Sequence, residues 1–184
     1  MTWPFAALWE HALPYGQFVK DSTAHCELWT GVYRLSRIPA WAVEAATALP
    51  GRFRLVVLAE DWCGDATNSV PVLARWAEAT ANVELRILRR DAHDDVMQRY
   101  LTDGTARSIP VVIVLTEGMD ELGWWGPRPR ALQEWSAAER AKGRSKAELY
   151  PEIRRWYAKD KGETTIREVL AVMAGSHHVQ GVPT

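Results

Sequence analysis

Residues 53–65 have the sequence FRLVVLAEDWCGD, in which a short apolar run leads to a cysteine followed by glycine. The run at 53–59 consists largely of aliphatic residues and is bounded by turn-forming residues, so it predicts a buried strand. Residues 64–80 have apolar positions at helical spacing. Cys63 therefore lies where a predicted strand ends and a predicted helix begins.

The segments after this helix continue the alternation of strands and helices. Residues 83–88 predict a second strand, which gives a βαβ unit with parallel strands. A helix over 94–101 follows, and residues 110–115 and 121–125 predict a hairpin. Parallel and antiparallel pairs together indicate a mixed sheet in a protein of the α/β class.

Helices are predicted on both sides of this core. The first fifty residues indicate helices, including one over 22–37 that Ser22 or Thr23 would cap. A further helix begins at or after Pro129. We expect one domain, divided into a helical N-terminal extension at 1–51, a core at 52–142, C-terminal helices at 143–175 and a flexible tail at 176–184.

Composition limits the classes of function. The chain has 184 residues, of which 47% are hydrophobic and 24% charged, as in a single globular domain. A net charge of -1 gives no general attraction to nucleic acid or to anionic membranes. No apolar stretch approaches the roughly 20 residues that cross a bilayer. With two cysteines and no metal-ligand spacing, we expect no metal or other cofactor and a cytoplasmic location. No oligomeric state is indicated.

Cys63 is the strongest candidate for chemistry. A cysteine at the start of a helix faces free backbone N–H groups, whose partial charge favours the thiolate and lowers its pKa. Asp61 and Asp65 oppose this effect by repulsion, so the pKa falls only if the helix terminus and nearby arginines outweigh them. Arg90 and Arg107 are expected at the same sheet edge, where they would stabilise a thiolate or bind a carboxylate. A small buried side chain without reactivity is the other interpretation.

Two motifs resemble the thioredoxin superfamily. Trp62-Cys63-Gly64-Asp65 is similar to its Trp-Cys-Gly-x active-site turn, and Ser108-Ile109-Pro110 is similar to its cis-proline loop. The order of the core elements is also similar. From about residue 25 to 174 the chain resembles, more closely, a bacterial thioredoxin-like family of poorly defined function with one active-site cysteine. Four motifs carry this resemblance, namely EDWCGD at 60–65, LRRD at 88–91, RSIP at 107–110 and WGPR at 125–128.

The resemblance implies a thioredoxin-like fold (a βαβ-α-ββ-α core with additional terminal helices), a cis bond before Pro110 and a groove in which Cys63 is the catalytic residue. It implies substrate contacts for Trp62, Gly64, Asp65, Ile109 and Pro110, with Asp61, Arg90 and Arg107 as supporting residues. The chain departs from a dithiol thioredoxin in two places. Ala66 stands where the second cysteine of Cys-x-x-Cys would be, and Val57 replaces a buried acid.

Without a second cysteine nearby, a mixed disulfide at Cys63 must be released by another thiol. Cys26 is the one internal candidate, although its helical spacing to Trp29 and Tyr33 favours packing in the core. The resemblance implies a thiol-redox protein that acts by monothiol exchange or thiol sensing and is reset by an external thiol. Its partners would be proteins or low-molecular-weight thiols and disulfides. The alternative is a non-catalytic module that binds an extended peptide or protein partner, so the reactivity of Cys63 decides whether the protein is an enzyme.

Overall fold

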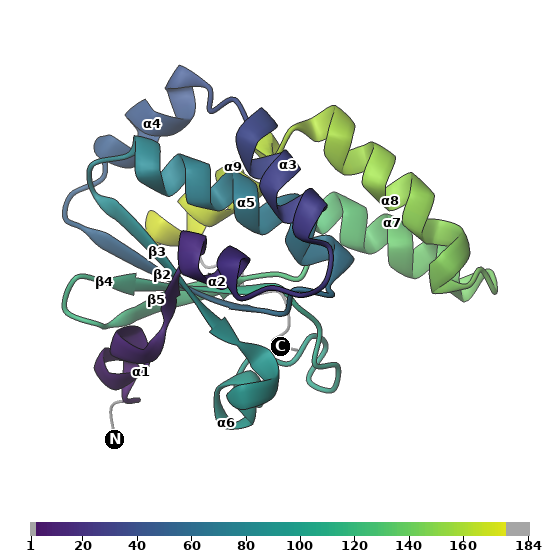
Figure 1. Ribbon diagram of the computed structural model, residues 1–184, viewed down its shortest axis with the longest axis horizontal. Helices are drawn as coiled ribbons and strands as arrows, with labels where there is room; N and C mark the ends of the chain where they lie inside the picture. Colours follow the sequence, from purple (N-terminus) through teal and green to yellow (C-terminus); the bar gives the residue numbers. More distant parts are fainter. Residues whose placement is uncertain (1–2, 176–184) are drawn as a thin grey trace.

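The computed structural model describes residues 3–175, which form a five-stranded sheet with helices on both faces (Figure 1). The strand order is β1-β3-β2-β4-β5. β2 and β3 pair in parallel and the other neighbours pair antiparallel, which confirms the α/β class and the mixed sheet. The strands are β1 (Leu13–Pro14), β2 (Phe53–Ala59), β3 (Val83–Arg89), β4 (Val111–Thr116) and β5 (Glu121–Trp125).

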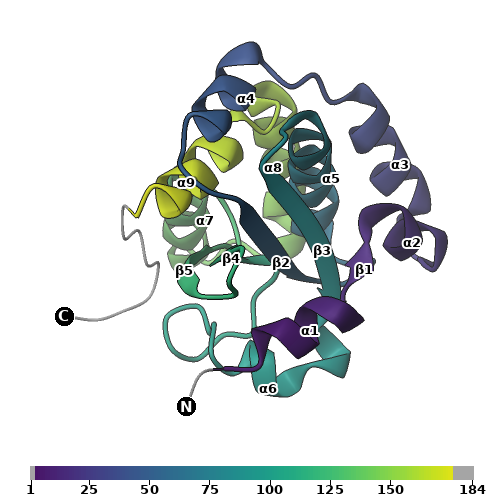
Figure 2. The same ribbon diagram turned by 90° about the vertical axis from the view of Figure 1, so that its left-hand side faces the viewer.

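The helices are distributed unequally over the two faces of the sheet. α5 and α9 pack on one face with α3 and α4 outside them, whereas α1 and α6 lie on the other (Figures 1 and 2). Within residues 3–175, no helix is long and apolar enough to span a membrane. The helices are α1 (Phe5–His11), α2 (Tyr15–Lys20), α3 (Cys26–Leu35), α4 (Ala40–Thr47), α5 (Gly64–Ala79), α6 (Asp94–Met97), α7 (Arg130–Ala141), α8 (Lys146–Asp160) and α9 (Glu163–Met173).

Two segments depart from the helices that the sequence predicts. Leu13–Pro14 forms a short edge strand on β3 instead of part of a helix. An edge position suits this pair, because proline lacks the N–H that an inner strand would need and holds the residue before it extended. α6 ends at Met97 rather than near residue 101, and the chain then turns back on itself.

The start of α3 also differs from the prediction. The helix begins at Cys26, and neither Ser22 nor Thr23 caps it. The carboxylate of Asp61 accepts the backbone N–H groups of Thr23 and Ala24 at 2.7 and 3.2 Å. These two bonds hold the segment before α3 against the end of β2, so the helix starts later than its apolar spacing suggests.

The C-terminal helices divide into two parts. α9 packs on β4 and β5, and its apolar side chains join the main core, although it lies outside the 52–142 segment that the sequence suggested. α7 and α8 instead form a hairpin with a small core of its own, made of Leu132, Leu149, Ile153 and Tyr157. Figure 1 shows this hairpin extending beyond the end of the sheet. The expected flexible tail at 176–184 lies outside the described residues.

Two loops meet at the end of the sheet that carries the site. The Ile109–Pro110 bond is cis, as predicted, and the Gly126–Pro127 bond, for which there was no prediction, is also cis. Gly126 has a φ of +141°, and a Cβ atom there would overlap the carbonyl oxygen of Pro110. Glycine therefore allows the loop after β5 to approach the cis-proline loop.

Gly126→Ala should lower the free energy of unfolding by at least about 2 kcal/mol, because it combines an unfavourable φ with a backbone clash. Urea denaturation followed by tryptophan fluorescence measures this change. Gly31→Ala in α3 is the matched control, since a Cβ there meets nothing within 4 Å. A helix interior should gain up to about 1 kcal/mol from the same exchange. Equal effects of the two substitutions would contradict the close approach.

Candidate functional site

Cys63 is the N-cap residue of α5 and follows the carboxyl end of β2. It is 8% exposed, and its Sγ donates to the carbonyl oxygen of Ile109 at 3.4 Å. The backbone N–H groups of Asp65 and Ala66, in the first turn of α5, point at the sulfur. The thiol is thus held between a helix N-terminus and the cis-proline loop, two elements that lie far apart in the sequence.

The thiol of Cys63 is not activated by this position. Burial, followed by the charge of Asp65, raises its pKa to about 11. The N–H groups of the first turn and the charge of Lys146 act in the opposite direction but do not compensate. The condition that the sequence set for a lowered pKa is therefore not met. Burial of the thiolate away from water and the charge of Asp65 outweigh the helix N-terminus. At neutral pH the group is a protonated thiol.

Asp65 forms a buried ion pair with Arg128, which lies in the loop between β5 and α7. Nε and Nη2 of Arg128 donate to the two carboxylate oxygens, each at 2.7 Å. The hydroxyl of Tyr157 in α8 lies 3.4 Å from the same carboxylate, to which it donates. Nη1 of Arg128 also donates to Gln133 and Ser136 of α7. Asp65 thus joins α5 to the α7–α8 hairpin.

Trp62 and two arginines lie on the other side of the thiol. Trp62 is 47% exposed, and the guanidinium of Arg90 lies over its ring, 5.0 Å from the centroid. Arg90 also pairs with Asp91 at 2.7 Å and donates to the carbonyl oxygen of Arg107. Arg107 itself pairs with Asp94 at 2.6 Å. Both arginines therefore have an acidic partner already.

Asp61 and Gly64, which the sequence also selected, have structural roles. Burial alone would raise the pKa of Asp61, but the N–H groups before α3 and the charge of Arg89 hold it below its ordinary value. The carboxylate of Asp61 faces that segment and does not line the cavity. Gly64 lies under the hydroxyl of Tyr150, which a Cβ atom would overlap. Glycine therefore allows α8 to pack next to Cys63.

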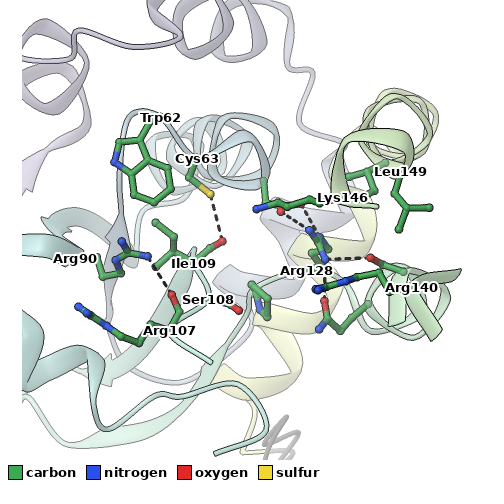
Figure 3. A pocket seen from close by; sticks show the side chains of 15 residues that line it. Trp62, Cys63, Arg90, Arg107, Ser108, Ile109, Arg128, Arg140, Lys146 and Leu149 are labelled. Carbon is green, nitrogen blue, oxygen red and sulfur yellow. Dashed lines mark hydrogen bonds and ion pairs between the residues drawn. The ribbon is translucent and has the colours of Figure 1, made fainter. Parts of the chain in front are cut away.

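A cavity of about 340 Å³ opens beside Cys63, between the cis-proline loop and the α7–α8 hairpin (Figure 3). Of the residues that the sequence selected, it brings together Trp62, Cys63, Asp65, Arg90, Arg107 and Ile109. Gly64 and Pro110 adjoin these residues without lining the cavity. Sequence reasoning missed the lining residues Pro127, Arg128, Gln133, Ser136, Arg140, Lys146, Leu149 and Ile153. Ser108 also lines the cavity; it belongs to the quoted RSIP motif but was not selected as a site residue. Of the eight missed residues, Pro127 and Arg128 had a sequence signal, because they are part of the WGPR motif.

Cys26 lies exposed at the start of α3, and its thiol donates to the carbonyl oxygen of Ser22 at 3.3 Å. The prediction that Cys26 packs in the core is therefore wrong. Trp29 is the one residue of α3 that is buried. Cys26 and Cys63 are both free thiols.

A mixed sheet with a cysteine at a helix N-terminus facing a cis-proline loop defines a thioredoxin-fold protein. The thioredoxin family model Thioredoxin_9 matches residues 12–142, and the chain belongs to this family.

Two solved structures resemble the chain over most of its length. One is an HIV epitope-scaffold and the other a protein of unknown function from Pseudomonas aeruginosa, each with 24% sequence identity and a TM-score of 0.72. The comparisons cover 93% and 94% of this chain and 98% of each of the other chains. At this identity the likeness shows the fold alone. No curated protein matches the sequence.

The raised pKa of Cys63 should make its alkylation slow. In a Cys26→Ser background at pH 8, iodoacetamide should modify the folded protein at least about 100-fold more slowly than the same chain in urea, since the two pKa values differ by about two units or more. Mass spectrometry follows the reaction. Cys26 in a Cys63→Ser background is exposed and should react within a few-fold of its unfolded rate.

The charge of Asp65 can be tested in the same assay. Asp65→Asn removes the negative charge that repels the thiolate and also weakens the contact with Arg128 that holds the hairpin over the thiol. Both changes should lower the pKa of Cys63, so alkylation at pH 8 should accelerate. Glu121→Gln, which breaks an ion pair with Arg99 at the far end of β5, is the control. Near-UV circular dichroism must show that both variants are folded. In the assay of the preceding paragraph, equal alkylation rates for Cys63 in the folded protein and in urea would contradict the raised pKa of Cys63.

Proposed function

We propose that Cys63 alone acts in thiol–disulfide exchange or as a sensing thiol, forming a mixed disulfide with a ligand disulfide, which an external thiol later releases. The observation that carries this proposal is the position of the Cys63 sulfur. It lies on the wall of an open cavity and is hydrogen-bonded to the carbonyl before cis-Pro110. A sulfur-containing ligand in the cavity would therefore meet the thiol and the loop backbone together.

The exchange needs no other oxidant than the disulfide itself. Cys63 loses its proton to solvent, and the thiolate attacks one sulfur of the ligand disulfide. The ligand S–S bond breaks as the new bond to Cys63 forms. One half of the ligand leaves as a thiolate and takes up a proton, so it is reduced while Cys63 is oxidised.

Burial and the raised pKa both favour a long-lived mixed disulfide. A thiol with a high pKa is a poor leaving group, so an external thiol that attacks the ligand sulfur expels Cys63 slowly. Attack on the Cys63 sulfur itself is hindered, because the residue is 8% exposed. Ala66 provides no thiol for local release. These properties favour sensing or capture over rapid turnover.

The raised pKa also favours a second candidate function. If Cys63 stays protonated under all conditions, the protein would be a non-catalytic module whose groove binds an extended peptide or another protein. Covalent capture distinguishes the two functions, because only the first forms a bond to Cys63.

Incubation of the Cys26→Ser protein with 2,2′-dithiodiethanol at pH 9 should add one half of this disulfide to Cys63, as seen in the intact mass. A chase with excess dithiothreitol should then release it at least tenfold more slowly than the same adduct on exposed Cys26 in a Cys63→Ser background. Labelling of Cys26 without any labelling of Cys63 would contradict the proposed function and support the binding module.

Ala66→Cys should shorten the life of the adduct. Ala66 is fully buried in the first turn of α5, three residues after Cys63, so a thiol there is placed to attack the mixed disulfide. We expect release without a chase and formation of an internal disulfide, detected as a loss of two hydrogens by mass spectrometry. Ala66→Ser introduces a side chain similar in size to that of cysteine but without sulfur, and this variant should keep the adduct. An unchanged lifetime in a folded Ala66→Cys protein would contradict the geometry.

A further inference from the structure

The cavity beside Cys63 is strongly cationic. Its lining contains a single acid, Asp65, whose charge is already matched by Arg128. Figure 3 shows the cations gathered in two groups with the thiol between them. One group is Arg90 and Arg107 near Trp62, and the other is Arg128, Arg140 and Lys146 by the α7–α8 hairpin.

The two groups differ in how their charges are compensated. Arg90 and Arg107 each pair with an aspartate at the rim. Arg140 and Lys146 are exposed, and neither makes an ion pair or a side-chain hydrogen bond with any of residues 3–175. Two cations without counter-charges therefore border the cavity at its hairpin end. Such a pair attracts an anion into a partly enclosed space, where the interaction is stronger than in open water.

The α7–α8 hairpin also limits the size of the ligand that can reach the Cys63 thiol. Leu149 and Ile153 of α8 form one wall, and Tyr150 of the same helix packs against Gly64 next to the thiol. Cys63 is only 8% exposed behind this wall. A cavity of about 340 Å³ is at the small end of the range of ligand sites. Its size and walls favour a small molecule over a folded protein as the source of the ligand sulfur.

We propose that this cavity binds a low-molecular-weight disulfide that carries carboxylates, with its anionic groups on Arg140 and Lys146 and one of its sulfur atoms at Cys63. The inference deepens the proposed function and rests on it for the covalent step. Leu149 and Ile153 on the hairpin side and Ile109 on the side of the cis-proline loop contact the carbon chain of the ligand. The exchange follows the balanced step given above, with the anionic disulfide as oxidant.

A series of matched disulfides tests the charge preference. The anionic 3,3′-dithiodipropionate, the neutral 2,2′-dithiodiethanol and the cationic cystamine react with Cys26→Ser protein at low ionic strength. Each rate is divided by the rate with the same chain in urea, which removes the intrinsic reactivity of the reagent. The anionic disulfide should then be favoured over cystamine at least tenfold, and 0.5 M NaCl should reduce the preference.

Two double variants test whether Arg140 and Lys146 cause the preference for the anionic disulfide. Arg140→Gln/Lys146→Gln should reduce the ratio of the anionic to the neutral rate at least fivefold. Arg155→Gln/Lys159→Gln removes the same charge from exposed positions of α8 that do not line the cavity, and should leave the ratio unchanged. A ratio between two reagents is used because loss of Lys146 also raises the pKa of Cys63 and slows every reagent alike.

A binding measurement that needs no covalent step distinguishes a failure of this inference from a failure of the proposed function. Calorimetry on Cys63→Ser protein should detect 3,3′-thiodipropionate, a dicarboxylate thioether, and not the neutral 2,2′-thiodiethanol. Binding that Arg140→Gln/Lys146→Gln abolishes would support the anion site even if Cys63 forms no adduct. Equal normalised rates for all three disulfides, or no binding of the dicarboxylate, would overturn the inference while leaving covalent exchange at Cys63 intact.

Discussion

The ion pair between Asp65 and Arg128 connects the parts from which the site is built. Burying two charges is costly unless each is paired with good geometry, and here the pair is bidentate with both bonds at 2.7 Å. Through it the first turn of α5 is joined to the loop after β5, and Tyr157 brings α8 to the same carboxylate. The hairpin that walls the cavity is thus fixed at the point where Cys63 lies. A thioredoxin core without this pair would leave the cysteine beside an open groove.

The same arrangement determines the chemistry of the thiol. The helix N-terminus favours a thiolate, but the covering hairpin removes water, and the carboxylate that anchors the hairpin repels negative charge. The result is a protonated thiol that donates to a backbone carbonyl. Such a group reacts slowly and, once in a mixed disulfide, leaves slowly. Low reactivity is therefore a consequence of how the cavity is enclosed, and it suits a protein that holds a ligand for some time.

The sequence predicted the sheet well, because β2 to β5 have short apolar runs bounded by turn residues. The resemblance to thioredoxins implied that Cys63 would lie beside the cis-proline loop, and its thiol does donate to the carbonyl oxygen of Ile109. The hairpin side of the cavity could not be predicted. Arg140 and Lys146 lie in helices with ordinary surface patterns, and their approach to Cys63 depends on long-range packing around Tyr157 and Leu149. Nor could the sequence determine the sign of the pKa shift, because the burial of Cys63 comes from the same packing.

The most direct test of this account is a crystal structure of the Cys26→Ser protein after incubation with 3,3′-dithiodipropionate. The account predicts density continuous from the Cys63 sulfur into one half of the reagent, with its carboxylate at Arg140 and Lys146. The hydrogen bond from the thiol to Ile109 would then be lost. A free Cys63 thiol still bonded to that carbonyl, with the reagent absent from the cavity, would contradict the account and leave peptide or protein binding as the function of the groove.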